Sequence, residues 1–106
     1  MKNGLYKVEF ATQRGAGAGV VVLNNGKVQG GDSALSYDGT YVEDGNTFAA
    51  NVTTRRHTQG MPSVFGVDNV EIKIEGQIAG DKAALLGSVP TMPGVRFQAN
   101  LSPIAI

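Results

Sequence analysis

Apolar and polar residues alternate along several short segments of the chain, which is typical of strands that bury one face. The pattern is clearest over residues 70–78, where valine or isoleucine stands at positions 70, 72, 74 and 78 and charged or amide side chains stand at 71, 73, 75 and 77. The same reasoning predicts eight strands, over residues 4–10, 19–23, 27–30, 37–42, 47–55, 70–78, 83–89 and 95–101. No helix of ordinary length is predicted.

Tight turns separate most of the predicted strands. Asn25-Gly26 and Asp44-Gly45 are hairpin signals, because these residue types accept the positive φ angles of a two-residue turn. The glycine-rich run Gly15–Gly19 is interpreted as a flexible hairpin or bulge. A dinucleotide-binding loop would need a strand before this run and a helix after it, whereas three valines follow.

The predicted architecture is an all-β fold of eight antiparallel strands in up-and-down order, forming one domain over residues 1–106. A closed barrel and a two-sheet sandwich both fit this order. We favour the barrel, because few prolines or inward charges protect the edge strands that a sandwich would expose. An eight-stranded barrel holds either packed side chains or one small ligand. Val64 and Phe65, with Met61 beside a proline, put apolar side chains in the irregular connection 56–68. They either plug one end of the barrel or form an exposed apolar patch, and we favour the plug.

The amino-acid composition supports this fold class and argues against several classes of function. Glycine occurs 15 times, and valine, isoleucine and threonine together number 24 against 6 leucines, which favours strands and turns. The net charge is zero, so direct contact with nucleic acid is not expected. With no cysteine and one histidine, neither a thiolate nor a multi-histidine metal site is expected, and no cofactor is predicted. No apolar stretch reaches the ~20 residues of a membrane span and no signal peptide is recognised, so we expect a cytoplasmic protein.

Two polar clusters could carry chemistry. Arg55, Arg56 and His57 place potential cations together at the end of a predicted strand, and Asp32 and Ser33 lie in a turn-forming segment. An enzyme that uses these side chains at the barrel mouth is one hypothesis, although residue types alone do not define a catalytic triad. We expect no catalysis, because the chain lacks paired acids and a nucleophile motif. The simpler expectation is that the Asp and Ser side chains cap backbone amides within their turn.

Several motifs in the first part of the chain are similar to those of one known family. They keep the same order and similar spacing over residues 1–65: Met1–Tyr6 with a strand ending at Phe10, then Asn25-Gly26, Gly30-Gly31-Asp32, Tyr37 with Gly39, and Glu43-Asp44. In these features the chain resembles the GrlR family of negative regulators of type III secretion. The resemblance implies a lipocalin-like or fatty-acid-binding-like barrel, a homodimer, and a non-enzymatic role in which the protein sequesters a transcriptional activator.

The resemblance also implies two binding regions. The family's acidic partner-binding motif, Glu-Asp-Glu-Asp, corresponds here to Glu43, Asp44, Gly45 and Asn46, so the first two acids are kept. The family's barrel can accept a lipid-like ligand. Alternation alone predicts its lining here to be Tyr6, Val8, Phe10, Phe48, Val52, Ile72, Ile74 and Phe97.

Two main hypotheses result. The leading one is a regulator that binds a protein partner through the acidic hairpin, and the alternative is a barrel that binds a small apolar ligand. The two are compatible, because a ligand could tune the affinity for the partner. The apolar tail 103–106 is expected to pack on the barrel itself or on a second copy, and it contributes to the expectation of a homodimer.

Overall fold

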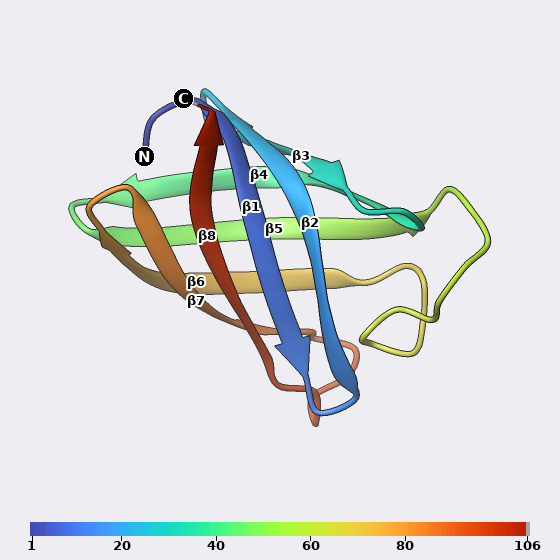
Figure 1. Ribbon diagram of the computed structural model, residues 1–106. Helices are drawn as coiled ribbons and strands as arrows, with labels where there is room; N and C mark the ends of the chain where they lie inside the picture. The colour runs from blue at the N-terminus through green and yellow to red at the C-terminus, as the bar shows by residue number, and fades with distance from the viewer. Residues whose placement is uncertain (106) are drawn as a thin grey trace.

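Residues 1–105, which the computed structural model describes, form eight antiparallel β-strands that close into a barrel (Figure 1). The strands are β1 (Gly4–Thr12), β2 (Gly15–Asn24), β3 (Lys27–Gly31), β4 (Leu35–Asp44), β5 (Thr47–Arg56), β6 (Glu71–Ala79), β7 (Lys82–Ser88) and β8 (Phe97–Ala105). Each strand pairs with its neighbours in the sequence, and β1 also pairs with β8. The predicted all-β, up-and-down barrel is confirmed. A sandwich is excluded, because the β1–β8 pairing leaves no edge strand.

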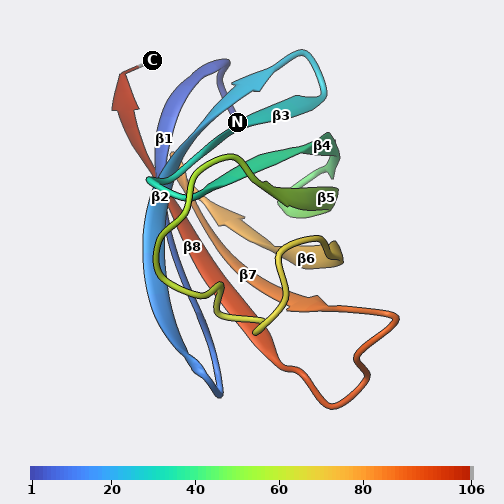
Figure 2. The same cartoon turned by 90° about the vertical axis from the view of Figure 1, so that its right-hand side faces the viewer.

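The barrel has two unlike ends (Figures 1 and 2). The first residues of the chain, the end of β8 and the β2–β3, β4–β5 and β6–β7 turns lie at one end, which we call the terminal end. The β1–β2, β3–β4 and β7–β8 connections lie at the other end together with the long β5–β6 connection, residues 57–70. We call this the long-loop end. No helix in the described part of the chain is long and apolar enough to cross a membrane.

Large side chains close the terminal end of the barrel. Tyr6, Leu23 and Phe48 are almost fully buried, and Tyr41 stacks on Phe48 with ring centroids 5.3 Å apart. The Tyr6 hydroxyl donates a hydrogen bond to the carbonyl oxygen of Lys2 at 2.5 Å, so its polar atom is satisfied in spite of its burial. This end is therefore a packed core.

The glycine-rich run Gly15–Gly19 forms the first half of β2, so the prediction of a flexible hairpin or bulge was wrong. The run pairs with β1 in unbroken register. A Cβ atom would come within 2.8 Å of the Phe10 ring at Gly17 and within 2.9 Å of the Tyr37 hydroxyl at Gly19. The missing side chains at these two positions therefore make room for two aromatic rings inside the barrel.

The C-terminal tail packs on its own barrel. Strand β8 continues through Ala105, with Pro103 opposite Tyr6 and Ala105 opposite Leu5 in β1. The prediction that the tail packs on the barrel is thus confirmed for residues 103–105, whereas Ile106 lies outside the described residues.

Candidate functional site

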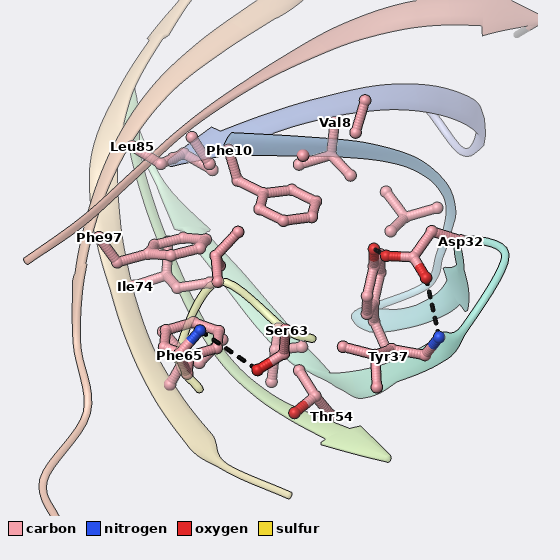
Figure 3. Close-up of a pocket in the computed structure, with 18 of the residues that line it drawn as sticks. Val8, Phe10, Asp32, Tyr37, Thr54, Ser63, Phe65, Ile74, Leu85 and Phe97 are labelled. Atoms are coloured by element: carbon pink, nitrogen blue, oxygen red, sulfur yellow. Dashed lines mark hydrogen bonds between the residues drawn. The ribbon is translucent and has the colours of Figure 1, made fainter. Parts of the chain in front are cut away.

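A cavity of about 260 Å³ occupies the interior of the barrel (Figure 3). All eight strands contribute to its lining, and most of the lining side chains are aliphatic or aromatic. Leu23 and Phe48, which belong to the packed terminal end, line it on that side. Residues 61–65 of the long loop line it at the other end. The cavity therefore runs from the packed terminal end towards the long-loop end.

The structure brings together most of the side chains that alternation predicts as a cavity lining. Seven of the eight border the cavity: Val8, Phe10, Phe48, Val52, Ile72, Ile74 and Phe97. Tyr6 does not, and this prediction is corrected. It is fully buried in the packed terminal end, where its burial raises the pKa of the phenol. Alternation identifies the face of a strand that points inward, but not the depth at which a side chain lies.

Four aromatic rings surround the cavity near the long-loop end, and we call them the aromatic collar: Phe10, Tyr37, Phe65 and Phe97. The Phe10 ring meets Tyr37 edge-on at 6.0 Å between centroids and stacks on Phe97 at 6.2 Å. Phe97 in turn stacks on Phe65 at 5.7 Å. Phe65 comes from the long loop and is only 3% exposed, so the prediction that it plugs one end of the barrel is confirmed. For Met61 the prediction is wrong, because its side chain is largely exposed.

Arg56 fastens the long loop at its start. Its guanidinium forms an ion pair with Asp68 at 2.9 Å and donates hydrogen bonds to two carbonyl oxygens of the loop, at 3.0 and 3.1 Å. The hydrogen bond from Arg56 lowers the pKa of Asp68. From the β1–β2 side, the Thr12 hydroxyl donates to the carbonyl oxygen of Val64 at 2.5 Å. The Arg56 side chain is therefore engaged by the long loop.

Two hydroxyl groups that line the cavity are also engaged with the long loop. Thr54 donates to the carbonyl oxygen of Asp68 at 2.9 Å and accepts from the backbone N–H of Val70 at 3.3 Å. Ser63 donates to the carbonyl oxygen of Val67 and accepts from the N–H of Phe65 at 3.2 Å. Both side chains stabilise the loop over the cavity.

Asp32 lies at the rim of the cavity, between β3 and β4, and is half-buried. One carboxylate oxygen accepts from the backbone N–H groups of Ala34 and Leu35, at 2.9 and 2.8 Å. The Tyr37 hydroxyl donates to the other oxygen. The expectation that the side chains of this turn cap backbone amides is thus confirmed for Asp32, whereas no such hydrogen bond of Ser33 is found within residues 1–105. Its contact with the collar residue Tyr37 was not predicted.

Electrostatics keep this pair in defined protonation states. Burial raises the pKa of Asp32, but hydrogen bonds from Tyr37, Leu35 and Ala34, with a smaller effect of His57, outweigh burial and leave the pKa below its usual value. Burial raises the pKa of Tyr37, and the hydrogen bond to Asp32 raises it further. At neutral pH the carboxylate is therefore ionised and the phenol remains a hydrogen-bond donor.

The other residues of the enzyme hypothesis do not assemble into a relay. His57 Nε2 contacts the backbone carbonyl oxygen of Asp32 at 3.0 Å, and its Nδ1 contacts the Thr58 hydroxyl at 2.7 Å. The ring therefore meets the main chain of Asp32 and not its carboxylate. Arg55 is exposed, and its carbonyl oxygen accepts a long hydrogen bond of 3.4 Å from Ser36.

The predicted acidic hairpin lies at the terminal end, opposite the long loop (Figure 1). Glu43, Asp44, Gly45 and Asn46 are all classed as exposed, and Gly45 has the positive φ of 60° expected for the turn. The Glu43 carboxylate forms an ion pair with the terminal ammonium group of Met1. The hairpin and the cavity mouth are therefore separate surfaces.

No family model matches the chain, and no curated protein sequence matches it. Within residues 1–105, no group of three or more histidine, aspartate or glutamate side chains could hold a metal ion. The cavity and the acidic hairpin are therefore the features of the molecule that indicate a function.

Proposed function

We propose that the chain is a binding protein whose lipocalin-like or fatty-acid-binding-like barrel holds one small apolar molecule. The observation that carries this proposal is the cavity of about 260 Å³ with a largely apolar lining. Apolar cavities of about 150 Å³ stay dry when empty and take up benzene or xenon. A larger apolar cavity gains more from a ligand, because more lining atoms lack contacts when it is empty.

The volume sets the size of the ligand. Since a cavity of about 150 Å³ takes up benzene, which has six carbon atoms, a cavity of 260 Å³ accommodates in proportion about ten non-hydrogen atoms. Met61, which is 82% exposed and also borders the cavity, lies where such a molecule would enter beside the long loop. The proposal is therefore a short alkyl or single-ring compound and not a long-chain lipid.

Titration calorimetry with 1-octanol tests the proposal, because this alcohol has the expected size and carries no charge. We expect one molecule to bind per chain. The variant Ala99→Leu, which fills part of the cavity from β8, should bind the alcohol more weakly. The matched variant Ala84→Leu adds the same atoms on the exposed side of β7 and should bind as wild type does. Absence of binding to the wild-type protein would contradict the proposal.

A second candidate function is regulation of a protein partner, such as a cytoplasmic transcriptional activator, through the hairpin Glu43–Asn46. What favours it is the surface beside the hairpin. Val42 is 67% exposed there, and a hollow of about 250 Å³ on β4, β5 and β6 is bordered by Val42, Lys73 and Glu75. An exposed apolar side chain next to acidic groups suits a partner with a basic, partly apolar surface.

A pull-down that compares the wild-type protein with two charge-reversal variants tests this second function. Asp44→Lys changes the hairpin without disturbing the ion pair between Glu43 and the chain terminus. Asp81→Lys makes the same change in the β6–β7 turn at the same end of the barrel. A partner that is retained by wild type and by Asp81→Lys, but lost by Asp44→Lys, supports the hairpin as the contact. Equal retention by all three would contradict it.

Homodimer formation is part of the regulator proposal. The exposed Ile104 of β8 is close in register to Leu5 of β1, whose partner across the β1–β2 ladder is the exposed Val22. These apolar side chains form a patch that a second copy could cover. Light scattering should then give twice the chain mass of 11.0 kDa, and Ile104→Lys should reduce it. A particle with the mass of one chain at micromolar concentration would contradict a dimer.

A further inference from the structure

The charged side chain in the cavity lining limits which classes of ligand can bind there. Among the described residues that line the cavity, Asp32 is the only one with a charged side chain. Its pKa is lowered, so this charge is negative at neutral pH. A fatty acid or any other carboxylate would bring a second negative charge into a space with a low dielectric constant, where repulsion is strong. The lining therefore disfavours the anionic lipids that the barrel shape alone would suggest.

Asp32 has hydrogen-bonding capacity left for a ligand. An ionised carboxylate offers about four acceptor positions. Two backbone N–H groups use both acceptor positions of one oxygen, and the Tyr37 hydroxyl uses one acceptor position of the other oxygen. One acceptor position remains on the oxygen that faces Tyr37.

No basic side chain pairs with this carboxylate. Within residues 1–105 the ion pairs join Met1 to Glu43, Lys7 to Glu9 and Arg56 to Asp68, so none includes Asp32. His57 and Arg56 are near enough to act on Asp32 electrostatically. However, the His57 ring contacts the main chain, and Arg56 is held by the long loop.

The aromatic collar adds a second feature that favours a cation. Figure 3 shows Asp32 and Tyr37 together on one side of the cavity, with Phe10 between them and Phe97. The face of an aromatic ring attracts a cation within about 6 Å of its centre. The Tyr37 hydroxyl contacts the carboxylate, and the Phe10 ring meets Tyr37 edge-on with centroids 6.0 Å apart, so aromatic rings form the cavity wall next to the carboxylate. A cation at this position would have a carboxylate oxygen as its partner and aromatic rings nearby.

We propose that the natural ligand is an apolar amine, whose ammonium group binds to Asp32 at the rim while its hydrocarbon body fills the aliphatic interior. This inference rests on the proposed function, because it names the ligand class of the same cavity. The ammonium group donates to the free position of the carboxylate, beside Tyr37. The hydrocarbon body replaces the contacts that side chains such as Leu85 and Ile74 lack when the cavity is empty.

Three probes with eight carbon atoms each test the inference by titration calorimetry at neutral pH: octylamine, 1-octanol and sodium octanoate. The wild-type protein should bind octylamine at least about tenfold more tightly than octanol, since the ammonium group makes a charge-assisted hydrogen bond. Octanoate should bind most weakly. This ranking needs no variant, so it stands even if a substitution at the rim impairs folding.

Two variants assign the effect to Asp32. Asp32→Asn keeps the shape of the side chain and should remove most of the preference for octylamine, while binding of octanol shows that the cavity is intact. Asp38→Asn removes a carboxylate from the exposed side of β4 and should leave all three affinities unchanged.

The outcomes separate the two proposals. If none of the three probes binds, the proposed function fails and the ligand class fails with it. If octanol binds but octylamine binds no more tightly, or if Asp32→Asn keeps the preference for the amine, the ligand class is wrong and the binding function stands.

Discussion

Filling the cavity with a larger side chain should make the protein more stable. Ala99 of β8 is buried and borders the cavity, whereas Ala84 of the neighbouring strand β7 is exposed. We therefore expect Ala99→Leu to raise the free energy of unfolding. Ala84→Leu makes the same chemical change on the outer face of the barrel and should alter stability by less than about 0.5 kcal/mol.

The magnitude follows from the atoms that enter the cavity. Leucine adds three carbon atoms to alanine, and their burial contributes roughly 2.4 kcal/mol at about 0.8 kcal/mol each. The same effect expressed by volume is similar, because about 90 Å³ out of 260 Å³ would be filled at roughly 24 cal/mol per Å³. Ordering the leucine side chain costs about 0.5–1 kcal/mol. The expected net gain is about 1.2–1.9 kcal/mol.

Thermal and urea unfolding, followed by circular dichroism, measure this gain. For a chain of this size, it corresponds to a rise in the melting temperature of at least about 5 °C. Overpacking of a core that is already filled has the opposite sign and costs about 1–3 kcal/mol. A loss of stability in Ala99→Leu, with no change in Ala84→Leu, would therefore refute the claim that the barrel interior is hollow.

Three further predictions concern the residues that shape the cavity and its rim. Gly19→Ala should lower the free energy of unfolding by about 1–3 kcal/mol, because a Cβ atom there would lie 2.7 Å from the carbonyl oxygen of Gly31; an unchanged urea midpoint would contradict this. Acid should destabilise wild type more than Asp32→Asn. Because the folded-state pKa of Asp32 is lowered, the carboxylate contributes fully to the free energy of unfolding at pH values above its usual pKa of about 3.9. This contribution is lost as the pH falls through the folded-state pKa, and parallel acid-unfolding curves of wild type and Asp32→Asn would contradict it. Arg56→Gln should speed amide hydrogen exchange in residues 57–68 but not in β1, because it removes an ion pair and two hydrogen bonds to loop carbonyls; equal protection of the loop would show that other contacts hold it.

The strands and their order could be predicted from the sequence because both are encoded locally. Alternation fixes which side chains point inward, and residues such as Asn25 and Gly45, both with positive φ, fix the hairpins. Closure into a barrel followed from the lack of protected edges. The plug was also predictable, since Phe65 is a large apolar residue in a segment where polar residues are expected.

The strand conformation of the glycine-rich part of β2 was not predicted. Glycine has no conformational preference that separates a turn from a strand, and the reason for Gly17 and Gly19 is the approach of Phe10 and Tyr37. The spacing of these glycines by two, with alanine between them, is the signal that could have indicated a strand.

The rim of the cavity depends on side-chain contacts that could not be predicted from the sequence. Asp32 and Tyr37 are five positions apart, and only the β3–β4 turn brings their side chains into contact. For Tyr6, the sequence predicted that the side chain points inward, but not that it lies in the packed terminal end. Whether a barrel is hollow depends on how deeply each inward side chain reaches.

A methyl-detected NMR titration of the wild-type protein with 1-octanol tests directly whether the interior of the barrel binds one small apolar molecule. We expect saturable shifts, at one molecule per chain, for the cavity-lining methyl groups of Val8, Ile72 and Leu101, with little change at the exposed Val42 and Leu86. Shifts confined to the exposed methyl groups, or no saturable shifts at all, would contradict it.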